Sequence, residues 1–174
     1  METWIRRETV YQGRIFSLLV GETRLDDGRV VIREMVQHNG GVAVVPVLDD
    51  SVILVRQFRI AIGRSLLELP AGRLEGDEAP EQRARLELEE ETGYRAGRMV
   101  LAASYYSSVG FTDERMFIFL AFDLEATAQN LEFDERIEIV KWPIATLENR
   151  LAAHEIEDAK TIIGLRALLA QIGD

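Results

Sequence analysis

The hydrophobic positions of this chain are grouped mainly in short runs that are rich in β-branched and aromatic residues. Runs of this kind, separated by turn residues, are typical of β-strands. They lie at residues 4–10, 15–21, 30–36, 42–48, 52–58, 66–69, 100–106, 115–122 and 137–142. The runs at 42–48 and 52–58 are almost continuously apolar, which indicates strands that are buried on both faces.

A different periodicity predicts a helix over residues 80–92. Pro80 suits the first turn of a helix, and Gly93 suits the position just after its end. Ala84 and Leu88, four residues apart, form the apolar stripe that would pack on a sheet, and Leu86 widens it. Two more helices are expected near the end of the chain, one around residues 146–153 and one that begins after Asp158 as its N-cap.

The order of these elements predicts an α/β fold. Strands come first, one helix follows, and more strands precede two terminal helices, which favours a sandwich built on a mixed sheet. The Asp26-Asp27-Gly28 sequence predicts a hairpin turn within the first strands. Three N-terminal strands are too few to be stable alone. We therefore expect residues 1–40 to pack on the main body, residues 41–174, or on a second subunit.

Composition narrows the class of protein. The chain has 174 residues, 47% of them hydrophobic, which suffices for one core. The net charge of −10 argues against binding to nucleic acids and to anionic membranes. There is no cysteine, so we expect neither disulfides nor thiolate metal sites, and we predict a cytoplasmic protein. The first residues carry no signal-peptide pattern, and no apolar run is long enough to span a membrane.

The candidate metal-binding residues lie within residues 71–94, where a glycine-bearing turn precedes the glutamate-rich helix. Glu87, Glu90 and Glu91 are spaced so that they share one helix face. Clustered carboxylates repel one another unless a positive charge lies among them, and hard divalent cations prefer such oxygen ligands. This stretch therefore predicts a metal site that handles phosphates. Glu89 points away from the other three and is expected to be a solvated charge.

Several residues outside this stretch are candidates for substrate contacts, each with a structural alternative. Arg56 and Arg59 follow a buried strand, where α/β folds often bind ligands, so either of them is a phosphate contact or a charge at the strand edge. Trp4 is either interface core or a platform for a base. Phe111, in the polar loop 107–114, is either loop core or a nucleoside contact.

Residues 72–94 resemble the Nudix box, whose pattern is G-x5-E-x7-R-E-U-x-E-E-x-G-U, with U an aliphatic residue. The residues in register are Gly72, Glu78, Glu87, Leu88, Glu90, Glu91 and Gly93, with Tyr94 at the last aliphatic position. Within this family, residues 42–59, 67–72 and 108–114 are similar to segments of the ADP-ribose pyrophosphatases. The resemblance covers about residues 30–170, and the N-terminal strands resemble the dimerising segment of that subfamily.

The resemblance implies a Nudix-like α/β/α sandwich with a central mixed sheet, formed by residues 41–174, and a homodimer. It further implies hydrolysis of ADP-ribose to AMP and ribose 5-phosphate with Mg²⁺, or with Mn²⁺ in its place. The implied metal ligands are the Ala71 carbonyl, Glu87, Glu91 and Glu90. The catalytic candidates are Glu135 and Glu90, with Glu132 and Asp134 as alternatives to Glu135. Glu135 is either the base that activates water or a further metal ligand. The implied substrate contacts are Arg59, Arg56, Trp4, Gly110 and Phe111.

Two positions depart from the pattern. Leu86 occupies the place of the box arginine, which helps to hold the glutamates in the family, and Arg83 lies one helical turn before Glu87 as a replacement. Val109 stands where the subfamily usually has proline. Two alternatives therefore remain: a hydrolase of another nucleotide sugar such as GDP-mannose, and a module that binds a nucleotide without hydrolysing it.

Overall fold

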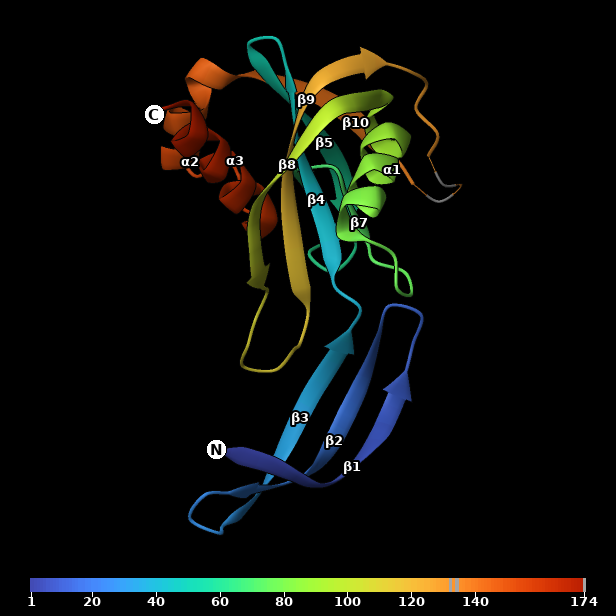
Figure 1. The fold of residues 1–174 in the computed structure, drawn as a ribbon, viewed down its shortest axis with the longest axis vertical. Helices are drawn as coiled ribbons and strands as arrows, with labels where there is room; N and C mark the ends of the chain where they lie inside the picture. The colour runs from blue at the N-terminus through green and yellow to red at the C-terminus, as the bar shows by residue number, and fades with distance from the viewer. Residues whose placement is uncertain (132, 134, 174) are drawn as a thin grey trace. The chain divides into compact units, whose positions relative to one another are not determined.

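The computed structural model describes residues 1–131, 133 and 135–173. Contacts divide the chain into two compact units (Figure 1). The first unit contains residues 1–40 and 105–115, and the second contains residues 41–104 and 116–174. Among the described residues, no helix has both the length and the apolar character needed to cross a membrane.

The first unit is a three-stranded antiparallel sheet with a loop attached to it. Its strands β1 (Glu2–Gln12), β2 (Phe16–Leu25) and β3 (Val30–His38) lie in chain order. The hairpin turn predicted between the last two is present, with Gly28 at φ 84°. The loop is joined to β3 because the Val36 N–H donates to the Phe111 carbonyl at 2.7 Å.

The second unit contains a seven-stranded mixed sheet with the order β10-β5-β4-β9-β8. Its strands are β4 (Gly41–Leu48), β5 (Ser51–Arg59), β6 (Arg64–Glu68), β7 (Ala71–Arg73), β8 (Tyr94–Tyr106), β9 (Arg115–Ala126) and β10 (Ile137–Pro143). Strand β4 is parallel to β9 and antiparallel to β5, so the sheet is mixed as predicted. The short strands β6 and β7 pair with β5 and β4, respectively.

The helices lie on two sides of this sheet, with α1 on one side and α2 and α3 on the other (Figure 1). They are α1 (Pro80–Thr92), the 3₁₀ turn η1 (Ile144–Thr146), α2 (Leu147–Ala152) and α3 (Ala159–Ile172). Gly93 ends α1 in the left-handed conformation, and the Asp158 carboxylate caps α3 by accepting from the Thr161 N–H. The predicted α/β/α sandwich is thus confirmed.

Strand β4 is the centre of the core because both of its faces are covered. Side chains alternate between the faces of a strand. Val42 and Val44 pack with Leu88 of α1, and all three are fully buried. Val45 faces α3, where a Cβ added to Gly164 would lie 2.9 Å from its Cγ2 atom. The close contact at Gly164 places α3 tightly against the sheet.

Candidate active site

Helix α1 carries two buried carboxylates that lie against strand β7. Glu87 and Glu91, one turn apart on α1, are only 5% and 4% exposed. The Ala71 N–H donates to Glu91 Oε2 at 3.0 Å. A Cβ added to Gly72 would lie 1.6 Å from Glu87 Oε1, so only glycine leaves room for this carboxylate.

Burial makes both carboxylates hold protons more tightly than usual. It raises the pKa of Glu91 to about 8, and the charge of Glu87 adds to the rise. Burial also raises the pKa of Glu87 to about 6, although Arg83 opposes the effect. Removing two negative charges from water is costly unless a positive charge compensates them. The pair is therefore suited to receive a cation.

The oxygen atoms at this pair supply some, but not all, of the ligands that a hard divalent cation needs. Carboxylate and carbonyl oxygens are the ligands that Mg²⁺ prefers, and Mg²⁺ commonly keeps several waters. Glu87, Glu91 and the Ala71 carbonyl would supply such oxygens. In the part of the chain that the structure describes, no three His, Cys, Asp or Glu side chains form a group that could hold a metal ion. A cation at the pair would therefore take its remaining ligands from the backbone, from water and from the substrate.

The other predicted acidic residues lie at different distances from this pair. Glu135 is close enough to raise the pKa of both Glu87 and Glu91 through its charge, and Glu90 does so for Glu87. The alternatives Glu132 and Asp134 lie outside the described residues. Glu89 instead forms an ion pair with Arg95 at 2.7 Å, in agreement with the surface role expected for it.

Arg83 occupies the place that the sequence suggested for it. Its Nη2 atom lies 2.5 Å from Glu87 Oε1, and its side chain is 19% exposed. Its Nε atom is buried and has no hydrogen-bond partner among the described residues. Leu86, which stands at the position of the missing arginine, is 47% exposed. Arg83 thus supplies a positive charge to Glu87 from one helical turn away.

Replacing Arg83 by glutamine is expected to lower kcat/KM about 10- to 100-fold, the usual cost of losing a group that orients a metal ligand. Glu87 would lose the ion pair that fixes its orientation. Steady-state kinetics against the candidate substrate would measure the loss. Arg85→Gln is the matched control, since Arg85 pairs with the exposed Glu81 on the same helix. Equal effects of the two substitutions would contradict this role of Arg83.

The two arginines of β5 have different surroundings. Arg59 reaches Glu68, a carboxylate that is 2% exposed, with Nε 2.6 Å from Oε1 and Nη2 2.9 Å from Oε2. Arg56 lies on the opposite face of the strand, where it pairs with the exposed Glu138 at 3.3 Å. The structure therefore brings Arg59, but not Arg56, toward the carboxylate pair, because Arg59 and Glu91 affect each other's pKa.

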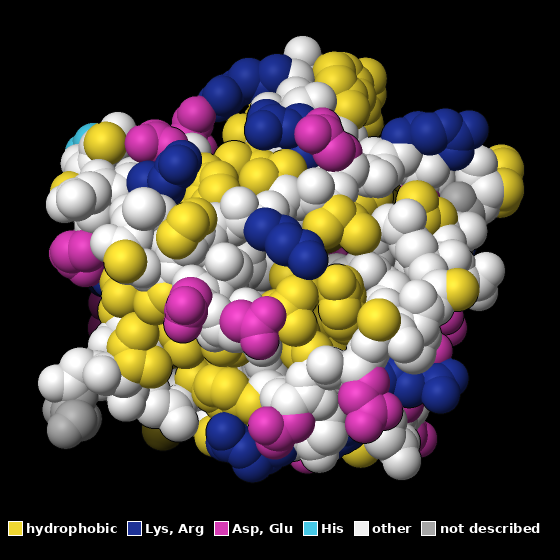
Figure 2. Space-filling model, turned by 90° about the horizontal axis from the view of Figure 1, so that it is seen from above, with side chains coloured by type: hydrophobic (Ala, Val, Ile, Leu, Met, Phe, Trp, Pro, Cys, Tyr) yellow, Lys and Arg dark blue, Asp and Glu magenta, His cyan; other side chains and the backbone are white. Residues whose placement is uncertain are grey.

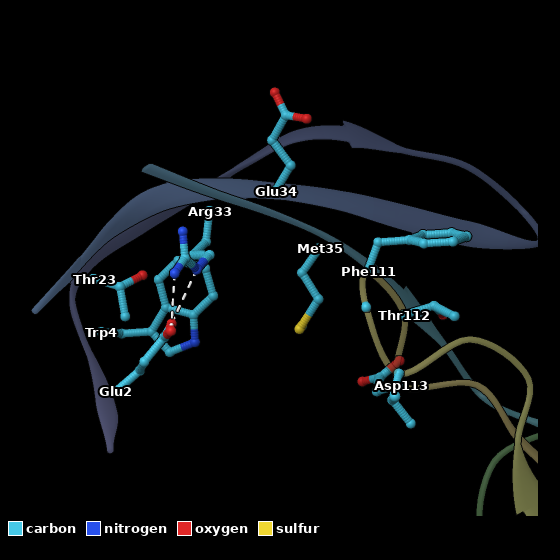
Figure 3. Close-up of a pocket in the computed structure, with 11 residues that line it drawn as sticks. Glu2, Trp4, Thr23, Arg33, Glu34, Met35, Phe111, Thr112 and Asp113 are labelled. Atoms are coloured by element: carbon cyan, nitrogen blue, oxygen red, sulfur yellow. Dashed lines mark hydrogen bonds and ion pairs between the residues drawn. The ribbon is translucent and has the colours of Figure 1, made fainter. Parts of the chain in front are cut away.

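The first unit contains a separate pocket of about 380 Å³ (Figure 3). It brings together three residues that the sequence proposed for substrate contacts, Trp4, Gly110 and Phe111. The residues Glu2, Thr23, Arg33, Glu34, Met35, Val109, Thr112 and Asp113 complete the lining. Val109, Thr112 and Asp113 belong to the segment 108–114 that resembles the ADP-ribose pyrophosphatases. The other five residues were not predicted, because their strand positions carry no motif. Figure 3 shows Arg33 joined to Glu2, and the two side chains form paired hydrogen bonds of 2.8 and 2.9 Å.

Figure 2 shows one face of the molecule, on which acidic, basic and hydrophobic side chains are interspersed.

On the side of the sheet where α3 packs, two charged residues were not among the predicted site residues. They are Glu68 and Lys160. Lys160 forms an ion pair with the buried Glu68. A glutamate inside the apolar run 66–69 indicates a buried carboxylate, and a buried carboxylate needs a cation as its partner. Nothing in the local sequence indicates which cation that is.

Comparisons with known proteins agree with this architecture. The NUDIX domain model matches residues 37–163. An ADP-ribose pyrophosphatase of Bacillus subtilis (strain 168) is 40% identical over 171 residues, which cover 96% of this chain and 92% of that protein. A methanol dehydrogenase activator of Bacillus methanolicus is 34% identical over 173 residues, covering 98% and 94%. The fold matches a crystal structure of ADP compounds hydrolase with a TM-score of 0.90 at 23% identity, covering 99% and 94% of the two chains. The chain therefore belongs to the Nudix family.

Proposed function

We propose that this protein hydrolyses the diphosphate bond of ADP-ribose to give AMP and ribose 5-phosphate. The observation that carries the proposal is the buried pair of Glu87 and Glu91, held against Ala71 and Gly72. A polyanionic substrate could reach such a negative site only through cations. The similarity to an ADP-ribose pyrophosphatase over nearly the whole chain supports this choice of substrate.

The proposed reaction adds water to one phosphorus atom and breaks its bond to the bridging oxygen. A bound Mg²⁺, or Mn²⁺ in its place, would neutralise phosphate oxygens and lower the pKa of a coordinated water. Of the chain's own residues, Arg59 would donate to a phosphate oxygen, because guanidinium groups suit this geometry. Glu135 would accept the proton of the attacking water, and Glu90 is the second catalytic candidate.

We further propose that the pocket of the first unit binds the nucleoside. Its aromatic residues Trp4 and Phe111 offer apolar surface, and its volume falls within the range of small-molecule sites. The hydroxyl of Thr23 is buried and has no hydrogen-bond partner in the described part of the chain. Because this hydroxyl is closed to solvent, a ligand would be held by the aromatic surface rather than by Thr23.

The first unit also supports a homodimer as the working form. All residues of β1 are exposed, including the hydrophobic Ile5, Val10 and Tyr11 at 44%, 50% and 54%. Exposed hydrophobic groups on a small sheet favour association with a second copy. Sedimentation velocity would measure the association state, and a monomer at micromolar concentration would contradict it. We propose a cytoplasmic location, which suits a chain without cysteine.

Incubation of the purified protein with ADP-ribose and Mg²⁺ tests the function directly. We expect AMP and ribose 5-phosphate in equal amounts by ion-exchange chromatography, and no product when EDTA removes the metal. GDP-mannose, assayed in parallel, should turn over more slowly. Absence of product from every nucleotide sugar at high enzyme concentration would refute the proposal. Tight binding of intact ADP-ribose without turnover would instead identify a nucleotide-binding module.

A further inference from the structure

A chain of charged side chains links α3 to the arginine beside the proposed active site. Glu68, at the end of β6, accepts hydrogen bonds from Arg59 of β5 and from Lys160 of α3. Lys160 also lies 3.0 Å from the N-cap residue Asp158. The Glu68 side chain is 3% exposed and that of Lys160 is 15% exposed. Two cations thus share one buried carboxylate and use both of its oxygens.

The next residue of the same segment is also fixed by α3. The Leu69 N–H donates to Thr161 Oγ1 at 2.8 Å, and this hydroxyl donates to Asp158 Oδ2 at 2.6 Å. A Cβ on Gly164, one turn further along α3, would lie 2.5 Å from Leu69 Cδ1. There is therefore no space between the helix and this segment. Interiors packed this closely transmit displacements rather than absorbing them.

The segment fixed in this way leads directly into the proposed metal site. Ala71, whose N–H binds Glu91, comes three residues after Glu68. Arg59 uses Nε and Nη2 for Glu68, and its Nη1 atom takes part in no hydrogen bond among the described residues. The Arg59 side chain is 41% exposed, whereas its partner Glu68 is buried. The guanidinium therefore has one edge fixed by protein and another available to a ligand.

We propose that Lys160 is a positioning residue for the active site. By binding Glu68 Oε2, the oxygen that also accepts from Arg59 Nη2, it fixes the carboxylate against which the Arg59 guanidinium is aligned toward the diphosphate. Without Lys160, Glu68 is free to rotate with Arg59, and the ligand-facing edge of the arginine loses its orientation. This role rests on the proposed function, because Arg59 is assigned to a phosphate there.

Lys160→Met, which keeps the length of the side chain and removes its charge, is the central variant. We expect it to raise the KM for ADP-ribose about tenfold, the order expected when one charge-assisted hydrogen bond is misaligned, with kcat changed less than threefold. Lys160→Arg should restore most of the affinity. Arg166→Met is the matched control, since Arg166 on the same helix pairs with the exposed Glu148.

A double-mutant cycle separates positioning from general structural support. If Lys160 acts through Arg59, Lys160→Met has no further effect on the KM of the Arg59→Ala variant. An equal effect with and without Arg59, or no effect in the wild-type background, would overturn the proposal. If Lys160→Met does not fold, the pair Glu68→Gln/Lys160→Met removes both charges and is expected to give the same rise in KM.

Hydrogen exchange of the Arg59 Nε–H, followed by NMR without substrate or metal, tests the same idea independently of activity. The signal should exchange at least about tenfold faster in Lys160→Met and remain protected in Arg166→Met. Unchanged protection in Lys160→Met would overturn the positioning role. Wild-type protein that neither binds nor hydrolyses nucleotide sugars would refute the proposed function, while the exchange measurement would still decide the role of Lys160.

Discussion

Glu91→Gln is expected to lower kcat about a thousandfold, because a cation site contributes several kcal/mol to stabilising the transition state. The substitution keeps the size of the side chain and its ability to accept from the Ala71 N–H. It removes the negative charge that a divalent cation needs. Steady-state kinetics with ADP-ribose at saturating Mg²⁺ would measure the loss. A rate within tenfold of wild type would contradict the assignment of Glu91 as a metal ligand.

The same substitution is expected to stabilise the metal-free protein at high pH. The pKa of Glu91 is about 8 in the folded state against an ordinary value of 4.5, so the folded state binds more protons between these values. The stability that this group contributes is complete below pH 4.5 and is lost as pH rises through 8. In EDTA at pH 9, the free energy of unfolding of the glutamine variant should exceed that of wild type by an amount on the order of a few kcal/mol.

Thermal unfolding with and without Mg²⁺ completes this test. Mg²⁺ should raise the Tm of wild type at pH 8 and raise that of Glu91→Gln much less. Glu89→Gln is the matched control, since Glu89 lies on the same helix and pairs with Arg95 at the surface. It should leave both kcat and the response to Mg²⁺ unchanged. A variant that is less stable than wild type at pH 9 in EDTA would contradict the buried-charge argument.

Gly72→Ala is expected to reduce kcat/KM about a hundredfold while the protein remains folded. The new Cβ would lie 1.6 Å from Glu87 Oε1, 2.0 Å from Cδ and 2.5 Å from Cγ, so the carboxylate must leave its position. A displacement of this size in a catalytic group commonly costs about two orders of magnitude in rate. Steady-state kinetics would measure the loss, and circular dichroism would show that the fold is retained.

Two further variants show whether the loss passes through Glu87. The double variant Gly72→Ala/Glu87→Gln should be no worse than Glu87→Gln alone, because both changes remove the same carboxylate. Gly97→Ala is the matched control in another strand, where the added Cβ would come no closer than 3.1 Å to Asp123 Cβ. It should leave the kinetics unchanged. Additive losses in the double variant would show that Gly72 acts by another route.

The sequence was sufficient for most of the fold because its strongest signals are local. Pro80 and Gly93 marked the ends of α1, and the apolar runs marked β4 and β5. Strand β7 was missed because it has three residues, including Gly72, and exists only through its pairing with β4. Strand β8 begins at Tyr94 rather than near residue 100, because its first half contains Arg95, Gly97 and Arg98 and lacks an apolar pattern.

The site was predictable where its residues share one helix and unpredictable where they do not. Helical spacing alone placed Glu87, Glu91 and Arg83 together. The partners of Glu68 are 9 and 92 residues away along the chain, and only the folded sheet and α3 bring them to it. No local sequence pattern predicts these contacts of Glu68. The pocket around Trp4 also depends on the pairing of three strands with a distant loop.

Lys160 and Glu68 are 92 residues apart along the chain, so they are synthesised at different times. A ribosome adds residues in order, so β5, β6 and α1 are synthesised before α3. Until α3 docks, Glu68 has Arg59 as its cation and the Leu69 N–H lacks the Thr161 hydroxyl. A nascent chain that has not yet reached α3 therefore holds the buried Glu68 with one cation instead of two.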